Sequence, residues 1–495
     1  MNEEQIRLVK LSNAQMPIEE LNRISRMVAH TKRAMEIVTL IPGAADELRN
    51  GAEAFVSKYN LIIDDLEGLK KTVLPEYADY RKKFKADPNK SQEEIDELFK
   101  EMPYELFRYG QFISNKVLMR DRLRESLCAP NNPTIKKWRE RQVNRCQGSI
   151  GGSNESFIHA MVTYELAEGC SVGCEFCGLS AGRLKQVFRH TDENAELFRG
   201  VIKVCHEEIG DCAGLGMMYF ATEPLDNPDY QQFEDDYYNE FHVIPQITTA
   251  VADRDIERTR HFVHELYTRP GGFIHRFTIR SLDMAKRVLE AFTPEELLLV
   301  ELLPQFEEAP SFVPYTIVGK QARVTSERSD GLADPGTICC IDGFRINFPR
   351  KEVSIFTPCH MSEENPNGIA IAETVSFENA EDFRNKLHYL IDTYMVIDLP
   401  KDEPLKLYDY YVKEINPRYG NVLRATTGGE LLLLDKFKED YMIAIIDCLL
   451  ESKYSKHEIA AKIYKEHGEA TERTFYFLNQ LWKKGFIVDT KFFKR

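Results

Sequence analysis

The chain has 495 residues, of which 43% are hydrophobic and 29% charged, and its formal net charge is −15. This length is enough for two or three domains. The acidic balance argues against general nucleic-acid binding, which depends on Lys and Arg to neutralise phosphates. No apolar run approaches the roughly 20 residues that a membrane-spanning helix needs, and the acidic start at residues 1–4 gives no sign of an export signal. We therefore expect a cytoplasmic protein that binds neither nucleic acid nor a membrane.

Residues 1–150 predict a charged, helical N-terminal region without a catalytic motif. From about residue 155, strand-like and helix-like segments alternate along the chain. Strands are expected at 157–166, 216–221, 243–250, 273–280 and 297–303, and helices at 193–208, 253–268 and 283–292. Repeated βα units are typical of a parallel sheet covered by helices, so this α/β segment predicts a partial β/α barrel. Ligands of such sheets gather at the carboxyl ends of the strands.

Three cysteines stand in one short loop after the first expected strand: Cys170, Cys174 and Cys177, in a CxxxCxxC spacing. Three thiolates so placed can hold three irons of a 4Fe–4S cluster and leave the fourth iron open. An open position is what a metal site needs to act on a small molecule. A zinc site would need a fourth ligand at short spacing, and the next candidates, His190 and Cys205, are distant in sequence. Eleven cysteines is an odd count, which disfavours a disulfide framework.

With Phe176 directly before the last cysteine, this motif resembles the signature of the radical S-adenosylmethionine (SAM) enzymes. The resemblance implies a 4Fe–4S cluster whose open iron chelates SAM and whose electron cleaves it to a 5′-deoxyadenosyl radical. It also implies SAM contacts from Thr222 and Glu223, because these residues lie in a segment similar to the family's GGEP segment, with both glycines replaced. Thr248 and Ser281 end two later expected strands, where their hydroxyls are candidates for contact with the SAM ribose or carboxylate.

A second group of cysteines flanks an expected hairpin with arms at 345–348 and 352–356. Cys340 precedes the hairpin and Cys359 follows it, so the two should be near neighbours. Three interpretations stay open for these residues. They could carry an auxiliary iron–sulfur cluster, as in the SPASM extension that the segment resembles, or pack as small buried hydrophobes. A thiol here could also give a hydrogen atom to a carbon radical.

The runs 164–178, 221–228 and 340–359 together resemble the radical SAM peptide epimerases, which act on ribosomally made precursor peptides such as proteusins. The resemblance covers roughly residues 150–390. It implies an isomerase that removes a Cα hydrogen and returns hydrogen from a cysteine thiol on the opposite face. Cys340 or Cys359 would be the donor, and Cys339 is a weaker candidate.

The C-terminal residues predict short strands followed by three helices, at 436–450, 455–466 and 471–484. This order is typical of a winged helix, and it resembles the modules that recognise leader peptides in peptide-modifying enzymes. A structural cap is the main alternative. DNA binding is disfavoured because the third helix lacks a dense basic face.

The sequence therefore predicts four parts: a helical region (1–150), a partial (β/α)6 radical SAM barrel (151–330), a cysteine-bearing hairpin extension (331–400) and a winged-helix-like domain (401–495). The expected partners are a precursor peptide, through both its leader and its core, and an external electron donor. The expected activity is peptide epimerisation. One alternative is a radical SAM enzyme that forms thioether or carbon–carbon crosslinks, or excises backbone. The other is an iron–sulfur regulator that binds DNA.

Overall fold

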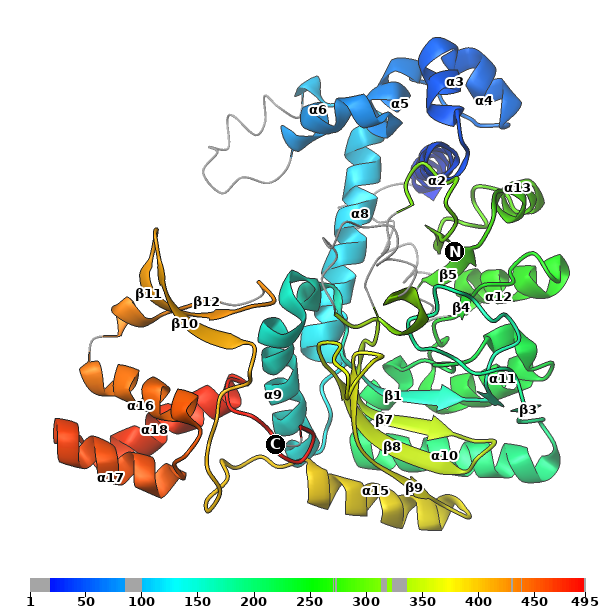
Figure 1. The fold of residues 1–495 in the computed structure, drawn as a ribbon. Coiled ribbons are helices and arrows are strands. Elements are labelled where there is room, and N and C mark those ends of the chain that lie inside the picture. The colour runs from blue at the N-terminus through cyan, green and yellow to red at the C-terminus, as the bar shows by residue number, and fades with distance from the viewer. Residues whose placement is uncertain are drawn as a thin grey trace. The chain divides into compact units, whose positions relative to one another are not determined.

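The computed structural model describes residues 18–84, 100–269, 271, 274–312, 318–322, 336–428, 431–437 and 439–493. The expected boundary between residues 330 and 331 lies outside these ranges. The fold is mixed α/β, as the sequence predicts, and the described strands form small open sheets without a closed barrel (Figure 1). The chain divides into two compact units. Unit 1 consists of Met1–Arg120, Glu223–Leu225 and His242–Pro314, and unit 2 of Asp121–Thr222, Asp226–Phe241 and Tyr315–Arg495.

Unit 1 contains a three-stranded parallel sheet. Its strands are β4 (Thr248–Thr249), β5 (His275–Ile279) and β6 (Val300–Pro304), hydrogen-bonded in that order. Helices α12 (Ile256–Thr268) and α13 (Leu282–Ala291) connect them. The last three strands expected from the βα alternation are thereby confirmed as parallel neighbours.

The first part of unit 1 is helical, as expected. Its helices are α2 (Ile18–Leu40), α3 (Ala44–Asn50), α4 (Ala52–Lys58), α5 (Leu66–Val73), α6 (Ala78–Lys82) and α8 (Tyr104–Arg122), with a 3-10 turn at Pro75–Tyr77. The last two residues of α8 fall in unit 2. Buried side chains of α2 such as Ala34 and Ile37 pack with Leu48 and Phe55 in one hydrophobic cluster, so these helices have a core of their own.

Unit 2 is built on a mixed four-stranded sheet in the order β1-β7-β8-β9. Its strands are β1 (Ala160–Glu165), β7 (Ile341–Asn347), β8 (Glu352–Pro358) and β9 (Ile369–Ser376). Strand β1 runs parallel to β7, and the other pairs are antiparallel. The expected hairpin is confirmed as β7 and β8. It is continuous with the strand that leads to the cysteine loop.

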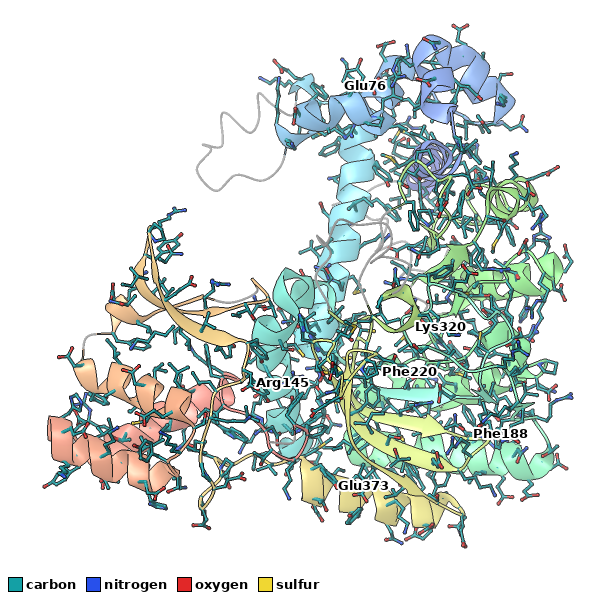
Figure 2. The ribbon with its side chains drawn as sticks, viewed as in Figure 1. Glu76, Arg145, Phe188, Phe220, Lys320 and Glu373 are labelled. Atoms are coloured by element: carbon teal, nitrogen blue, oxygen red, sulfur yellow. The ribbon has the colours of Figure 1, made fainter. Side chains whose placement is uncertain are left out.

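The described helices of this part of unit 2 include α9 (Pro133–Ile150), α10 (Asp192–Ile209), α11 (Tyr230–Phe241) and α15 (Ala380–Tyr394). Shorter helical turns occupy Leu123–Leu127, Gly151–Ser156 and Asp211–Leu215, and a two-stranded ribbon pairs β2 (Ala167–Glu168) with β3 (Gln186–Val187). A further short turn, Pro224–Asp226, includes residues of both units. The Phe188 ring, labelled in Figure 2, stacks on Phe233 of α11 and contacts Phe348 beyond the end of β7. Aromatic side chains thus join the sheet to its helices.

The strand expected at 216–221 is not formed, and this expectation was wrong. Only an isolated parallel bridge joins Met217 to Thr163 of β1. The Thr163 hydroxyl lies 2.6 Å from the carbonyl oxygen of Tyr219, a backbone acceptor that a neighbouring strand would otherwise use. A side chain therefore takes the place of a backbone donor at Tyr219.

The C-terminal part of unit 2 has the expected order of strands and then helices. Strands β10 (Tyr411–Asn416), β11 (Gly420–Ala425) and β12 (Leu431–Leu433) form an antiparallel sheet, followed by α16 (Asp440–Glu451), α17 (Lys456–His467) and α18 (Thr471–Lys483). Ser455 and Glu458 form a capping box at the start of α17. Leu478, Leu481 and Trp482 of α18 are buried in the core of this module.

Across the described ranges, no helix is both long enough and apolar enough to span a membrane.

Candidate functional site

The cysteine loop begins directly after β1 and β2. The Cys170 amide donates to the Gly182 carbonyl (2.9 Å), and the Leu184 amide donates to the Cys170 carbonyl (3.1 Å). Gly169 makes this pairing possible: its φ is +83°, and a Cβ there would stand 2.2 Å from the carbonyl oxygen of Arg183. Only glycine adopts that conformation without strain at such a close approach. The loop is therefore folded back on residues 182–184 at its first cysteine.

The three thiols of the loop are half-buried, and two receive backbone hydrogen bonds. The Val172 amide lies 3.4 Å from Cys170 Sγ, and the Ala181 amide lies 3.4 Å from Cys177 Sγ. Amide donors stabilise the thiolate form, and hydrogen bonds to the sulfurs tune the potential of an iron–sulfur cluster. The donor set of Cys170, Cys174 and Cys177 thus fits such a cluster chemically.

One shared metal ion is a poorer fit for these thiols. Two sulfurs that bind one zinc ion at about 2.3 Å each cannot be more than about 4.6 Å apart. Among the described residues, the side chains that bring three possible metal-binding atoms within 4.8 Å of one another are Cys146, His159 and Asp342, which lie outside the cysteine loop. The potential fourth ligands are also engaged: His190 Nε2 lies 2.9 Å from Asp236, and Cys205 is fully buried. In a 4Fe–4S cluster the three thiolates bind different irons and stand farther apart.

Side chains outside the loop hold its backbone in place. The Ser171 amide donates to Asp226 Oδ2 (2.8 Å), and the Ser171 hydroxyl donates to the other oxygen of the same carboxylate. Lys320, labelled in Figure 2, donates its backbone amide to the Cys177 carbonyl (3.0 Å) and its ammonium group to the Ala181 carbonyl (3.0 Å). These hydrogen bonds fix the loop backbone at both its first and its last cysteine.

The residues predicted to contact SAM are divided between the units. Thr222 is the last residue of a segment of unit 2, whereas Glu223, Thr248 and Ser281 belong to unit 1. Glu223 is buried, and its Oε2 accepts from the Ala250 amide just beyond β4 (2.9 Å). The structure therefore brings Glu223 to the carboxyl end of β4, near Thr248 in sequence.

Two of those hydroxyls already have protein partners. Thr248 Oγ1 lies 3.2 Å from Gln246 Nε2. Ser281 Oγ accepts from the Met284 amide (3.1 Å) and caps the N-terminus of α13. Helix capping fully explains a serine at this position, so Ser281 is the weakest of the predicted contacts.

Cys340 and Cys359 lie at the same end of the hairpin but in different surroundings. Cys340 immediately precedes β7, is half-buried, and its carbonyl accepts from the Ala160 amide of β1 (3.0 Å). Cys359 immediately follows β8 and is only 3% exposed, and burial raises the pKa of its thiol to about 12. Cys339 is equally sequestered. Of the candidate hydrogen donors, Cys340 is thus the accessible one.

A cavity of about 290 Å³ opens in unit 2 beside the hairpin. It is lined by Leu179, Phe220, Ala221, Arg345, Ser354, Phe356, Glu364, Asn365, Pro366, Asn367, Ile369 and Ile371. Leu179 comes from the cysteine loop, and Ala221 opens the segment that resembles GGEP. Cys340 packs against the hydrophobic cluster that also receives Phe220, Phe356 and Ile369. The cavity wall therefore adjoins both predicted functional cysteine groups.

The polar wall of the cavity depends on a buried ion pair that the sequence analysis missed. Glu165, the last residue of β1, is completely buried, and its Oε2 accepts from Arg345 Nε at 2.7 Å. The same oxygen accepts from Asn347 Nδ2 (2.9 Å), and the other carboxylate oxygen, Oε1, accepts from the Ala221 amide (2.9 Å). A glutamate that ends a fully buried strand is a usable signal, since such residues are rarely buried unless paired.

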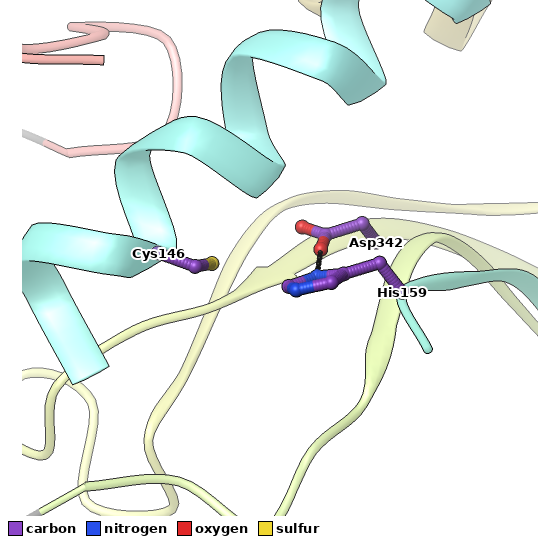
Figure 3. A group of neighbouring side chains, drawn as sticks. All are labelled: Cys146, His159 and Asp342. Atoms are coloured by element: carbon purple, nitrogen blue, oxygen red, sulfur yellow. Dashed lines mark hydrogen bonds and ion pairs between the residues drawn. The ribbon is translucent and has the colours of Figure 1, made fainter. Parts of the chain in front are cut away.

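A second buried polar group joins the start of β1 to β7. His159 Nδ1 is hydrogen-bonded to Asp342, and Cys146 of α9 completes a cluster whose ligand atoms lie within 4.8 Å of one another (Figure 3). The other ring nitrogen of His159 lies 2.8 Å from Asn154 Oδ1. The second Asp342 oxygen accepts from the Thr357 hydroxyl.

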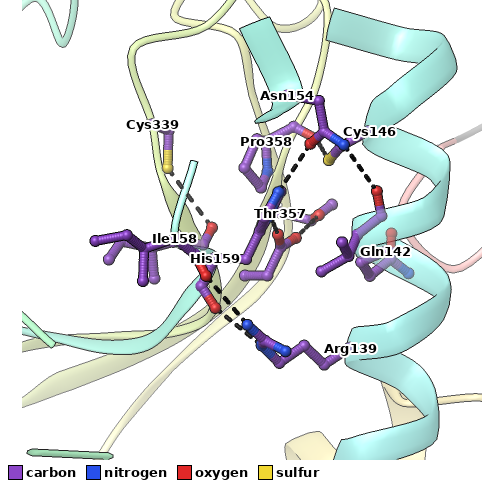
Figure 4. A network of polar contacts seen from close by, with 12 residues as sticks. Arg139, Gln142, Cys146, Asn154, Ile158, His159, Cys339, Thr357 and Pro358 are labelled. Carbon is purple, nitrogen blue, oxygen red and sulfur yellow. Dashed lines mark hydrogen bonds and ion pairs between the residues drawn. The ribbon is translucent and has the colours of Figure 1, made fainter. Parts of the chain in front are cut away.

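These partners argue against a metal at this cluster. Both ring nitrogens of His159 already face oxygen atoms, and the Arg145 guanidinium lies 3.4 Å from Cys146 Sγ and 2.9 Å from Thr357 Oγ1. Figure 4 shows the surrounding network, in which Arg139 also donates to the His159 carbonyl (2.9 Å). A positive guanidinium beside the sulfur and a hydrogen-bonded imidazole suit a structural network better than a cation site.

The fold and this site together define a mixed α/β protein with a half-exposed, amide-supported cysteine loop beside a cavity. The chain is similar to the uncharacterized protein y4wI of Sinorhizobium fredii, with 34% identity over 389 residues that cover 77% of this chain and 73% of the relative. It therefore belongs to the same family as y4wI. No known protein-family model matches the chain, and no solved structure matches it significantly.

Proposed function

We propose that this protein is a radical SAM peptide epimerase, which converts L-residues of a ribosomally made precursor peptide to D-residues. The observation that carries the proposal is the cysteine loop. Its three half-buried thiols lie in a CxxxCxxC spacing, and two of them accept backbone amides. This donor set suits a 4Fe–4S cluster with one open iron.

Each part of the site has a separate role in this proposal. Cys170, Cys174 and Cys177 would hold the cluster, and Thr222, Glu223, Thr248 and Ser281 are the candidate contacts to SAM. Bound cluster and SAM would supply the 5′-deoxyadenosyl radical that takes the Cα hydrogen of the peptide.

The protein's own contribution to inversion is the thiol. Cys340 is favoured over Cys359 because it is half-buried rather than sequestered. Its S–H bond breaks as a new C–H bond forms on the opposite face of the Cα radical, leaving a sulfur-centred radical. One electron from an external donor and one proton from solvent then restore the thiol before the next cycle.

The cluster and the SAM reaction can be tested without a peptide. Anaerobically reconstituted protein should contain about four irons and, with a chemical reductant, convert SAM to 5′-deoxyadenosine. Cys174→Ala should lose both properties. The Cys340→Ala/Cys359→Ala double variant should keep both, because these residues are outside the proposed cluster. Wild-type protein that cannot cleave SAM would refute the radical SAM assignment. An iron content above four per chain in the wild type that decreases in the double variant would indicate an auxiliary cluster.

Epimerisation is tested with a precursor peptide co-produced with the enzyme. In H2O its mass should stay unchanged while D-residues appear on chiral amino-acid analysis. In D2O each inverted residue should gain about one mass unit, because the thiol hydrogen exchanges with solvent. Cys340→Ala should abolish inversion while SAM cleavage continues. Inversion that survives this change but is lost in Cys359→Ala would make Cys359 the donor.

Product mass separates the main alternative from epimerisation. Crosslinking removes hydrogen, and backbone excision removes atoms from the peptide, so both change the mass in H2O. The DNA-binding alternative has little support, because the first turn of α18 carries Glu472 beside Arg473, which pairs with Glu439.

Two finer structural assignments accompany the proposal. The parallel strands β4, β5 and β6 are assigned to a partial (β/α)6 barrel, and the module at 401–495 to a winged helix that binds the leader peptide. The order of its strands and helices supports the second assignment. A cytoplasmic location follows from the need of an exposed cluster for a reducing compartment.

A further inference from the structure

We propose that the 290 Å³ cavity of unit 2 is the pocket that receives the peptide residue to be modified, and that it excludes acidic residues. This inference rests on the proposed function and specifies its substrate class. Three observations carry it: the size of the cavity, the ion pair that offsets the charge of Arg345, and the Glu364 carboxylate in the cavity wall.

The size of the cavity limits what it can hold. Pockets for drug-sized ligands usually measure about 300 to 1,000 Å³, and this cavity lies just below that range. It is therefore too small for a nucleoside cofactor together with a peptide, but large enough for one or two amino-acid residues.

The charge of the cavity disfavours an anionic occupant. The Arg345 guanidinium is paired with the buried Glu165 carboxylate through its Nε, so the pair is close to neutral. The Arg345 side chain is still 30% exposed, and it lies over the Phe220 ring at 5.5 Å. Its remaining N–H groups can donate to a neutral acceptor such as a peptide carbonyl.

An acidic residue would be disfavoured in this pocket. Glu364 lines the cavity and would repel a second carboxylate. Moving a charge out of water without a partner costs far more than burying an apolar side chain gains. Phe220, Phe356 and Ile369 would instead pack on an apolar side chain.

The position of Cys340 connects this pocket with the chemistry. Phe220, Phe356 and Ile369 line the cavity, and Cys340 belongs to the same hydrophobic cluster. Leu179, two residues after Cys177, lines the cavity as well, so one pocket adjoins both cysteine groups.

The test uses three capped dipeptides, N-acetyl-X-glycinamide with X as valine, asparagine or aspartate, and the full-length reconstituted protein. Affinity is measured by saturation-transfer NMR, which does not depend on turnover. The valine and asparagine probes should bind, and the aspartate probe should bind at least about tenfold more weakly than its neutral isostere asparagine, the ratio expected for roughly 1.4 kcal/mol. Equal affinity for all three probes would overturn the inference.

Two variants locate the binding. Arg345→Met should weaken binding of the valine probe by about two- to tenfold, the usual contribution of one hydrogen bond, but it leaves the buried Glu165 carboxylate without its cationic partner and can impair folding. Ile371→Trp is therefore the main variant: Ile371 lines the cavity and is 49% exposed, so tryptophan there should block the pocket without disturbing the ion pair. Ile415→Trp, at a residue that is 80% exposed on β10, is the matched control.

Unchanged binding of the valine probe in a folded Ile371→Trp variant would refute the pocket assignment. SAM cleavage is measured on the same preparations. If cleavage occurs but the probes do not bind selectively, only this inference fails. If the probes bind but no SAM is cleaved, the proposed function fails instead.

Discussion

His159 and Asp342 form a completely buried pair that connects the residue before β1 with the second residue of β7. Burial alone would raise the pKa of the Asp342 carboxyl, but the charge of His159 and the hydrogen bonds from His159 and Thr357 hold that pKa below its ordinary value. At the other end of the same two strands, Glu165 binds Arg345. The strand that leads into the cysteine loop is thus fixed to the strand that follows Cys340 at both ends.

Asp342→Asn should strongly destabilise unit 2. Removing one partner of a buried charged pair typically costs about 3 to 5 kcal/mol, because the other charge stays buried. We expect a clear fall in the urea midpoint, measured by circular dichroism. Lys185→Gln, which removes an exposed partner of Glu168, should leave the midpoint nearly unchanged. Equal effects of the two changes would contradict the structural role of the His159–Asp342 pair.

Two glycines of the cysteine loop should respond differently to alanine. Gly169→Ala places a Cβ against the Arg183 carbonyl and should disrupt the loop, whereas Gly173, with φ +66°, has open space around its Cα. Gly173→Ala should cost only the backbone strain of about 1 to 2 kcal/mol. Iron content after reconstitution should therefore fall sharply in Gly169→Ala and stay near wild type in Gly173→Ala. The reverse order would show that the loop has a different conformation.

Asp226 should be needed to hold the cysteine loop. Asp226→Ala removes both acceptors of the Ser171 amide and hydroxyl. We expect this variant to lose iron to a chelator faster than the wild type does, and the absorbance of the cluster measures the rate. Asp226→Asn keeps one oxygen acceptor, so its rate of iron loss should lie between those of Asp226→Ala and the wild type. A chelation rate that does not change in Asp226→Ala would exclude this role.

His275 should make the protein less stable in acid. Burial lowers the pKa of His275 from 6.5 to about 3, and its Nδ1 accepts from the Ile247 amide at 3.2 Å. Between pH 6.5 and about 3, His275 is protonated in the unfolded chain but stays neutral in the folded protein. The free energy of unfolding therefore rises with pH in this window. In His275→Asn, the loss of urea stability between pH 7.5 and 5 should be smaller than in wild type. An identical pH dependence would mean that His275 is not buried in its neutral form.

Local signals predicted several elements of the fold correctly. The helix expected at 193–208 is α10, which Thr191 caps by accepting from the Asn194 amide. The capping box at Ser455 and the turn between β7 and β8 are also set by residues a few positions apart. Interactions over such short separations can be identified from the sequence itself.

The pairings that shape the site could not be predicted in this way. Glu165 and Arg345 are 180 positions apart, and His159 and Asp342 are 183 apart. The pairing of β1 with β7 joins segments at similar separation, and a hydrophobic pattern does not specify which strand becomes the neighbour. The sequence therefore identified the cysteines, but the cavity that Leu179 and Arg345 line depends on tertiary contacts.

The burial of the thiols has a consequence for oxidative damage. Four of the eleven cysteines are half-buried, namely Cys170, Cys174, Cys177 and Cys340, and the other seven are buried. Oxidation selects accessible thiolates, so air should attack first the four residues assigned to chemistry while the rest of the chain stays reduced. In cluster-free protein, brief alkylation followed by peptide mass mapping should mark these four sites. A preparation whose functional cysteines are oxidised can therefore still be folded. The number of reactive thiols per chain would measure directly how much of the protein can still assemble a cluster.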